Sequence, residues 1–284
     1  MENKPIVIYH KDCPDGLAAA WCFWKEYGNK YDYHAGVYSV SPPDIFNKDV
    51  YMVDFSYKHD VMEMICHYAN NVMLLDHHKS ALEDLWDLNS SKINFDMSFA
   101  TTEKSGAMIA WDYVKQKENH KRKIPQILKH IEDRDLWKFE LPHTKEIMSA
   151  VFSYDKTLES YDKLMRLSSK GIKDLISVGT VLERKFNLDI TGLIKQCKRM
   201  VHLENHKIPM ANLNGMYASE AGNIMSEGFP FAATYYDTMS YRVFSLRSQE
   251  GGIDVSEIAI KFGGGGHKHA AGFKVDRNHV LARI

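Results

Sequence analysis

The 284-residue chain carries 36 lysines and arginines against 37 aspartates and glutamates, and 44% of its residues are hydrophobic. This composition is typical of globular proteins and excludes the disordered and fibrous classes. Because the formal net charge is −1, any binding of phosphate or nucleic acid must depend on a local electrostatic field.

Strand-like runs alternate with helix-periodic segments over the first 80 residues. The strand-like runs cover residues 6–9, 31–38, 50–53 and 72–75, and the helical segments between them cover residues 17–27 and 60–69. The longest apolar run, residues 17–24, is too short to cross a membrane, and the N-terminus lacks the apolar core of a signal peptide. We therefore expect a cytoplasmic protein with a helix-covered parallel sheet, no membrane partner and four reduced cysteines.

Helical patterns dominate the middle of the chain, at residues 103–116, at 125–132 and over a polar stretch from about 154 to 200. Strand-like patterns return after about residue 203 and are clearest at 231–236 and 242–246. We therefore predict an α/β protein of two domains. The first is a parallel-sheet domain over residues 1–190, and a helical connector at about 154–200 joins it to a smaller C-terminal α/β domain over residues 200–284.

Three of the apolar runs end at side chains that can bind a metal. These side chains are His10, Asp12 and Asp15 after the first run, Asp54 after the second, and Asp76, His77 and His78 after the third. An aspartate after a strand is often only a helix cap or turn former, but three such ends in succession exceed what capping requires. Because ligands bind where the carboxyl ends of parallel strands meet, we expect these side chains to converge. Imidazole and carboxylate ligands in this number suit two divalent ions such as Mn²⁺, about 3.5–4 Å apart, which is the arrangement for in-line displacement at phosphorus.

Two sequence motifs resemble those of the DHH phosphoesterases. Residues 74–79, Leu-Leu-Asp-His-His-Lys, resemble the signature of that family, and residues 263–273, Gly-Gly-Gly-Gly-His-Lys-His-Ala-Ala-Gly-Phe, resemble the glycine-rich motif of its C-terminal DHHA1 domain. Since the motifs occur in the family's order, the resemblance covers nearly the whole chain. It implies a parallel-sheet DHH domain, a DHHA1 domain and two Mn²⁺ ions, with Mg²⁺ as the alternative. Such RecJ-like proteins degrade single-stranded DNA, short RNA or cyclic dinucleotides.

The resemblance also implies roles for individual residues. The implied metal ligands are His10, Asp12, Asp15, Asp54 (as the bridge between the metals), His77 and Asp133, with Asp135 as the alternative to Asp133. The first motif is one residue longer than the family's usual His-x-Asp-x-Asp-Gly, which weakens the assignment of Asp12. Cys13 lies in this insertion, where we expect it to pack rather than to bind metal. We expect His78, with Asp76, to act catalytically near the substrate phosphate.

The glycine run at residues 263–266 is a candidate phosphate site. Glycines remove every Cβ, so backbone N–H groups can approach an anion closely, and a helix beginning near His269 would add a favourable field. Arg247, at the end of a predicted strand, can hold phosphate with two parallel hydrogen bonds. We therefore expect the substrate to be bound by Arg247, Gly264, Gly265 and His267, the alternatives being a flexible linker and a solvated edge charge.

These observations together predict a metal-dependent phosphodiesterase or exonuclease in which two metals generate hydroxide for attack on phosphorus. The near-neutral charge favours short single-stranded oligonucleotides or dinucleotides over long strands, whose binding needs extended basic surface. The alternatives are a pyrophosphate or polyphosphate hydrolase and a catalytically inactive nucleotide-binding regulatory protein. The choice between DNA and RNA, the polarity of cleavage and the formation of a homodimer stay open.

Overall fold

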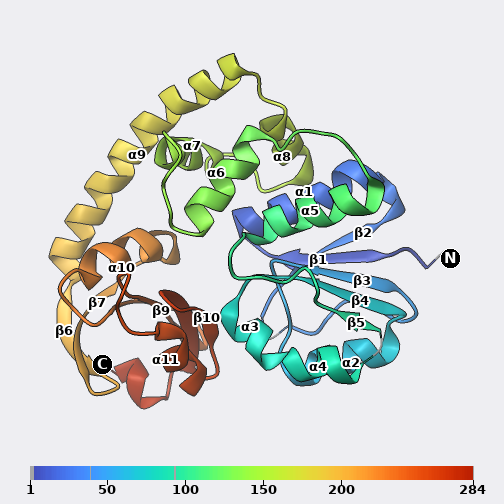
Figure 1. Ribbon diagram of the computed structural model, residues 1–284. Coiled ribbons are helices and arrows are strands. Elements are labelled where there is room, and N and C mark those ends of the chain that lie inside the picture. Colours follow the sequence, from blue (N-terminus) through green and yellow to red (C-terminus); the bar gives the residue numbers. More distant parts are fainter. Residues whose placement is uncertain (1–2, 39, 93, 284) are drawn as a thin grey trace. The chain divides into compact units, whose positions relative to one another are not determined.

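The computed structural model describes residues 3–38, 40–92 and 94–283. It divides into two compact units, Met1–Glu183 and Arg184–Ile284, and the division falls within the long helix α9 (Ser169–Cys197) (Figure 1). Helix α9 follows α8 (Leu158–Met165), so both lie in the stretch that the sequence marks as a helical connector.

The first unit is built on a parallel sheet of the described residues with the strand order β2-β1-β3-β4-β5. Its strands are β1 (Ile6–His10), β2 (Asp32–Gly36), β3 (Asp49–Val53), β4 (Asn71–Leu75) and β5 (Phe95–Asp96). Side chains of successive residues alternate between the two faces of this sheet: Val7 packs in one core cluster, and Ile6 and Ile8 pack in the other. Burial on both faces explains why the central strands are continuous apolar runs.

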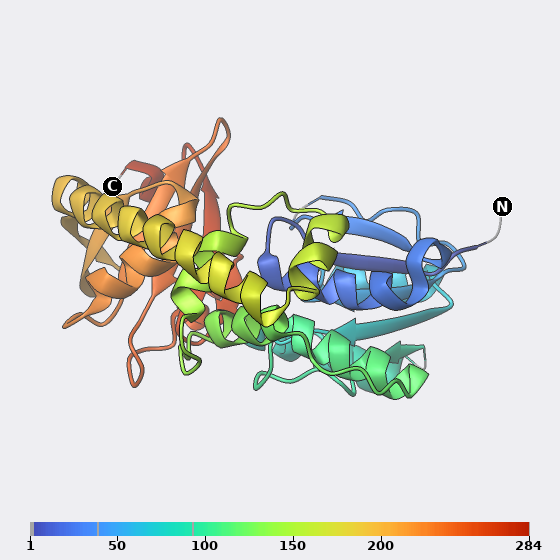
Figure 2. The same cartoon turned by 90° about the horizontal axis from the view of Figure 1, so that it is seen from above.

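Helices cover both faces of this sheet. Helices α1 (Pro14–Tyr27) and α5 (Gly106–Glu118) lie side by side on one face, as Figures 1 and 2 both show, and contribute to the core cluster that contains Val7. The same cluster includes residues of α6 (Gln126–Asp135), α7 (Thr144–Val151) and α8. Helices α2 (His59–Tyr68), α3 (Lys79–Asp84) and α4 (Trp86–Ser91) lie on the opposite face. The predicted α/β class is confirmed.

The second unit is a mixed sheet with the strand order β10-β11-β9-β8-β7-β6. The strands are β6 (Arg199–Leu203), β7 (His206–Asn212), β8 (Ala232–Asp237), β9 (Tyr241–Arg247), β10 (Gly265–His267) and β11 (Ala270–Asp276). Helix α11 (Val255–Lys261) packs in the core cluster of one face, and α10 (Ala218–Ser226) packs with residues of α9 in the other. Within the described part of the chain, no helix is long and apolar enough to cross a bilayer.

Candidate metal centre

The carboxyl ends of β1, β3 and β4 lie next to one another because these strands are adjacent and parallel. The register pairs Tyr9 with Val53 and Val53 with Leu75, so His10, Asp54 and Asp76 follow three neighbouring strands at nearly the same level. Asp54 leaves its strand in the left-handed backbone region, with φ of 52°, while its N–H donates to the Leu75 carbonyl at 3.0 Å. A non-glycine residue in this conformation is strained, and such strain is concentrated at functional sites.

Asp54 stands at the centre of the group and is 1% exposed. Its Oδ1 lies 3.0 Å from His77 Nε2, and its Oδ2 lies 3.7 Å from His10 Nδ1. The second distance is too long for a hydrogen bond, and both Oδ2 and His10 Nδ1 lack a hydrogen-bond partner among the described residues. Burial by itself raises the pKa of Asp54, but the neighbouring histidines outweigh it and hold this pKa well below its usual range. Asp54 is therefore a buried carboxylate whose two oxygens face different histidines.

Three carboxylates surround one nitrogen of His77. Besides Asp54, Asp135 Oδ2 lies 3.4 Å and Asp15 Oδ2 lies 3.8 Å from His77 Nε2. Burial by itself lowers the pKa of His77, but the hydrogen bond with Asp54 and the charge of Asp135 outweigh it and raise this pKa to about 10. Burial and the nearby carboxylates raise the pKa values of both Asp15 and Asp135. This crowding of buried negative charge is what a divalent cation would relieve.

Two groups of donors fit a pair of metal ions. His10, Cys13 and Asp54 have potential ligand atoms within 4.8 Å of one another, and so do Asp15, His77 and Asp135. Asp54 joins the groups through its two oxygens, as the predicted bridging ligand requires. The unsatisfied Asp54 Oδ2 and His10 Nδ1 are the kind of buried polar atoms that a bound cation would satisfy.

Asp76 holds His78 in place. Asp76 is fully buried, and its Oδ1 accepts hydrogen bonds from His77 N at 2.8 Å and from His78 Nδ1 at 2.7 Å. Burial by itself lowers the pKa of His78, but the charge of Asp76 outweighs it and raises this pKa. A carboxylate at Nδ1 fixes the tautomer that carries its proton there, which leaves the lone pair of the neutral ring on Nε2. Asp76 is thus suited to orienting His78, the residue predicted to act near the phosphate.

Two glycines that are not among the predicted site residues, Gly16 and Gly106, set the spacing of the candidate metal centre. A Cβ on Gly106 would lie 2.5 Å from Asp54 Cβ and 3.0 Å from Asp15 Oδ2, and one on Gly16 would lie 2.7 Å from the His10 carbonyl oxygen. Next to Gly106, at the start of α5, Ala107 N–H donates to both carboxylate oxygens of Asp15 at 3.2 Å. The sequence signal that could have located this helix start is the Ser105-Gly106 pair. Serine is a preferred N-cap residue, and Ser105 caps α5 by accepting a hydrogen bond from Met108 N at 3.3 Å.

Two predicted ligands lie outside these donor groups. Asp133 accepts hydrogen bonds from the backbone of Glu140 and Leu141 and from the Thr144 hydroxyl, so its carboxylate holds the loop that follows α6. Asp135, the alternative at the end of α6, is the one beside His77. Asp12 has a side chain that is 69% exposed, with Lys156 Nζ at 3.8 Å from its Oδ1. The structure therefore favours Asp135 over Asp133 and separates Asp12 from the ligand groups.

Two predicted substrate residues of the second unit, Arg247 and His267, lie on strands β9 and β10, which flank β11. Arg247 pairs with Ala270, which in turn pairs with His267, so the three form a row across β9, β11 and β10. Directly paired residues of antiparallel strands point to the same face, and two strand spacings separate Arg247 from His267 by about 10 Å. The Arg247 guanidinium donates to the Ser219 hydroxyl at 2.9 Å and to the Leu246 carbonyl at 2.8 Å.

The glycine run does not lead into a helix, which corrects the expectation of a helix near His269. Residues 265–267 and 270–276 form the hairpin β10–β11 instead. A Cβ on Gly264 would lie 2.0 Å from the Gly272 carbonyl oxygen, so this glycine is needed for the close approach of two chain segments. Gly263, with φ of 75°, ends α11 in the left-handed conformation typical of helix C-termini. Chain packing and the end of a helix therefore account for two glycines of the run, Gly264 and Gly263.

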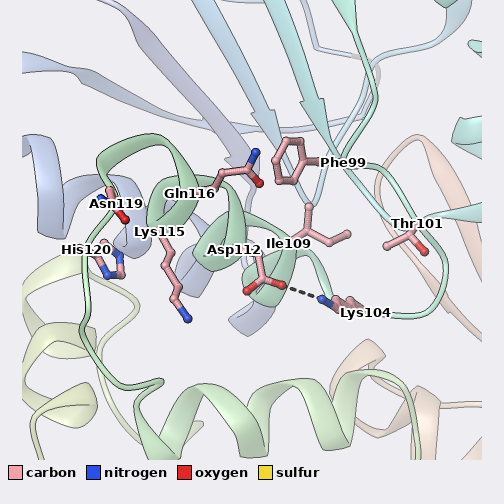
Figure 3. A pocket seen from close by; sticks show the side chains of 9 residues that line it. All are labelled: Phe99, Thr101, Lys104, Ile109, Asp112, Lys115, Gln116, Asn119 and His120. Atoms are coloured by element: carbon pink, nitrogen blue, oxygen red, sulfur yellow. Dashed lines mark hydrogen bonds and ion pairs between the residues drawn. The ribbon is translucent and has the colours of Figure 1, made fainter.

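A separate hollow of about 510 Å³ lies along α5 and the loop before it (Figure 3). Its lining residues are Phe99, Thr101, Lys104, Ile109, Asp112, Lys115, Gln116, Asn119 and His120. Lys104 pairs with Asp112 at 2.7 Å, and neither donor group described above contributes to the lining. Since this hollow lacks converging metal ligands, the chemistry is better placed at the strand ends.

The chain is similar in sequence to known proteins. It is 30% identical to an uncharacterized protein of Acanthamoeba polyphaga mimivirus over 294 aligned positions, and this alignment covers 95% of this chain and 67% of that protein. It is 26% identical over 239 positions to the oligoribonuclease NrnB of Bacillus subtilis, which covers 74% of this chain but only 54% of that enzyme. No family model matches the chain.

A solved structure matches the fold over nearly the whole chain. It is the DHH domain of a protein described as a member of a ribosomal-protein family, with a TM-score of 0.58, 11% identity and coverage of 97% of this chain and 83% of that one. The two sequence motifs and the matching DHH-domain fold agree with each other, and the similarity to the mimivirus protein extends over nearly the whole chain. The chain is therefore a member of the DHH/DHHA1 phosphoesterase family.

Proposed function

We propose that the protein is a two-metal phosphodiesterase that hydrolyses short single-stranded oligonucleotides or dinucleotides. The observation that supports this most strongly is the position of Asp54, whose two oxygens face two separate donor groups at the end of the sheet. A pair of divalent metals held this way would supply activated water near neutral pH and offset the charge that develops on phosphate oxygens. Mn²⁺ suits the carboxylate-rich group, with Mg²⁺ as the alternative.

The protein's own residues divide the remaining work. One metal, beside α5, would be held by Asp15, His77 and Asp135 together with Asp54 Oδ1, and the other would be held by His10 and Asp54 Oδ2. His78, whose Nδ1 contacts Asp76, would donate a hydrogen bond to a phosphate oxygen when its ring is protonated. Asp15 is kept in position by Ala107 N–H and by the absence of a side chain at Gly106.

We assign substrate binding to the second unit. Arg247 and His267 lie on one face of its sheet and carry donors that suit a phosphate away from the bond that is cut. Gly264 and Gly265 belong to the same proposal through their backbone N–H groups, although Gly264 also has a packing role. This division makes the first unit responsible for chemistry and the second for substrate affinity.

The similarity to an oligoribonuclease supports a short nucleic-acid substrate, and the net charge of −1 agrees with it, since long strands need extended basic surface. The test is a panel of end-labelled DNA and RNA oligonucleotides of two to about 20 nucleotides, with cyclic dinucleotides and polyphosphate, incubated with Mn²⁺ and resolved over time. We expect the highest kcat/KM for the shortest linear strands. Preferential hydrolysis of polyphosphate would replace this proposal, and binding without hydrolysis of any substrate would indicate a regulatory protein.

A further inference from the structure

Cys13 occupies an unusual position at the start of α1. It is the N-cap residue of that helix, yet its side chain makes no capping hydrogen bond. Its backbone is extended, with φ of −93° and ψ of 128°, because the next residue is Pro14, which disfavours helical geometry in the residue before it. The Cys13 carbonyl also accepts from Leu17 N at 3.0 Å. The backbone therefore holds the thiol at a fixed place beside the end of β1.

That place adjoins one of the two donor groups. A ligand atom each from Cys13, His10 and Asp54 lies within 4.8 Å of the other two. Asp54 Oδ2, on a side chain that is 1% exposed, has no hydrogen-bond partner among the described residues and lies 3.7 Å from His10 Nδ1. Nitrogen and oxygen ligands at about 2.1 Å from a tetrahedral metal are themselves about 3.4 Å apart, which is near the observed separation. The unsatisfied carboxylate oxygen thus independently indicates a cation beside the thiol.

We propose that Cys13 is a metal ligand and that its thiolate makes the two metal positions chemically different. On binding, the sulfur loses its proton to solvent and forms a bond to the metal. One position then offers sulfur, nitrogen and oxygen from Cys13, His10 and Asp54. The other offers one nitrogen and carboxylate oxygens from His77, Asp15, Asp135 and Asp54. This inference rests on the proposed metal centre and replaces the expectation that Cys13 only packs.

The difference in ligands predicts a difference in metal preference. Thiolate and imidazole favour Zn²⁺ and Co²⁺, whereas carboxylates favour Mn²⁺ and Mg²⁺. The Cys13 position should therefore select zinc or cobalt over manganese, while the position beside Asp135 keeps the preference for manganese. The fully loaded protein would then hold two different metals.

The test is titration of the full chain with Co²⁺, followed by the near-ultraviolet charge-transfer band that a thiolate–cobalt bond produces. We expect the band to grow with one equivalent of Co²⁺ and to vanish in Cys13→Ser, while the visible bands of cobalt at the other position remain. Cys197→Ser is the matched control, because Cys197 is partly exposed in the second unit, and the band should persist in it. Bound cobalt without this band in the wild type, or a band that survives in Cys13→Ser, would overturn the proposal.

Two further measurements keep the result interpretable. Cys13→Asp substitutes an oxygen ligand, so the ratio of zinc to manganese affinity should fall by on the order of tenfold or more. In the wild type, one equivalent of Zn²⁺ should protect Cys13 from alkylation by iodoacetamide, as mapped by mass spectrometry, whereas Mg²⁺ should not. Equal alkylation with and without Zn²⁺ contradicts the assignment even if a variant fails to fold.

These readouts do not depend on hydrolysis. A chain that shows the thiolate–cobalt band but cleaves no phosphodiester would refute the proposed function and leave the Cys13 ligand intact. A chain that cleaves oligonucleotides but never shows the band would refute the Cys13 ligand and leave the proposed function intact.

Discussion

Gly106 approaches Asp54 so closely that a Cβ on the glycine would lie 2.5 Å from the Asp54 Cβ. The contact joins the start of α5 to the end of β3, and it holds the strained Asp54 backbone against the helix. A glycine at this place therefore serves the geometry of the metal centre rather than the flexibility of a loop.

Gly106→Ala should displace Asp54 and weaken metal binding. In an unobstructed helix this change usually stabilises a protein by about 0.5–1 kcal/mol, because alanine loses less backbone entropy on folding. Gly192→Ala in α9 is the matched control, since a Cβ there meets nothing within 4 Å. Calorimetric Mn²⁺ titration and thermal unfolding of both variants provide the measurement. Wild-type metal affinity in Gly106→Ala would show that the contact is not needed.

Asp54→Asn and His77→Ala should each abolish hydrolysis without unfolding the chain. An asparagine amide in place of the Asp54 carboxylate cannot bridge two cations, and His77 supplies the nitrogen nearest three carboxylates. Circular dichroism checks the fold, and steady-state kinetics with excess Mn²⁺ on a dinucleotide checks activity. A folded Asp54→Asn protein with near-wild-type turnover would eliminate the two-metal account.

Asp133 and Asp135 should respond in opposite ways to substitution by asparagine. Asp133→Asn should lower stability by about 1–3 kcal/mol, because its carboxylate accepts two backbone N–H groups and the Thr144 hydroxyl. Asp135→Asn should weaken metal binding and raise the stability of the metal-free protein at neutral pH. Its raised pKa means that ionisation at neutral pH opposes folding. Chemical denaturation with a chelator, beside metal titration, distinguishes the two. Equal loss of metal binding in both variants would restore Asp133 as a candidate ligand.

Asp162 should make the stability of the first unit fall at acid pH. It accepts hydrogen bonds from Trp21 Nε1 at 3.1 Å and Lys25 Nζ at 3.0 Å, and Arg166 lies 2.7 Å away. Burial by itself raises the pKa of Asp162, but Lys25 and Trp21 outweigh it and lower this pKa. The stabilisation is therefore present above the ordinary aspartate pKa of about 3.9 and is lost as the pH falls below it.

The measurement for Asp162 is urea denaturation of the wild type and Asp162→Asn between neutral and acid pH. The difference in their free energies of unfolding should be largest near pH 7 and shrink as the pH falls below about 4. A difference that stays constant over this range would show that the ion pairs contribute little.

Arg247→Ala should mainly raise KM, since we assign Arg247 to a phosphate away from the reacting bond. Loss of one charged hydrogen-bond partner costs on the order of 1.5–3 kcal/mol, which corresponds to a tenfold to hundredfold loss in kcat/KM. Metal affinity should stay at the wild-type value. A large fall in kcat at unchanged KM, or loss of metal binding, would mean that the second unit takes part in the chemistry itself.

The convergence of His10, Asp54 and Asp76 could be predicted because apolar strand runs specify a buried parallel sheet, and such a sheet aligns its carboxyl ends. The choice between Asp133 and Asp135 could not be predicted. Helix α6 runs to Asp135, beyond the predicted end at residue 132, and tertiary packing decides which of its residues face the site. The approach of Gly106 to Asp54 joins residues about 50 positions apart, which no local pattern reveals. The β10–β11 hairpin was missed because four glycines have no strand propensity of their own.

The most direct test of the central claim is a crystal structure of the protein grown with excess Mn²⁺, in which anomalous scattering locates each metal and distinguishes manganese from any retained zinc. The account predicts two peaks about 3.5–4 Å apart, one bound to Asp54 Oδ1 with Asp15, His77 and Asp135, and the other bound to Asp54 Oδ2 with His10. A single peak, or two peaks of which neither contacts Asp54, would contradict it.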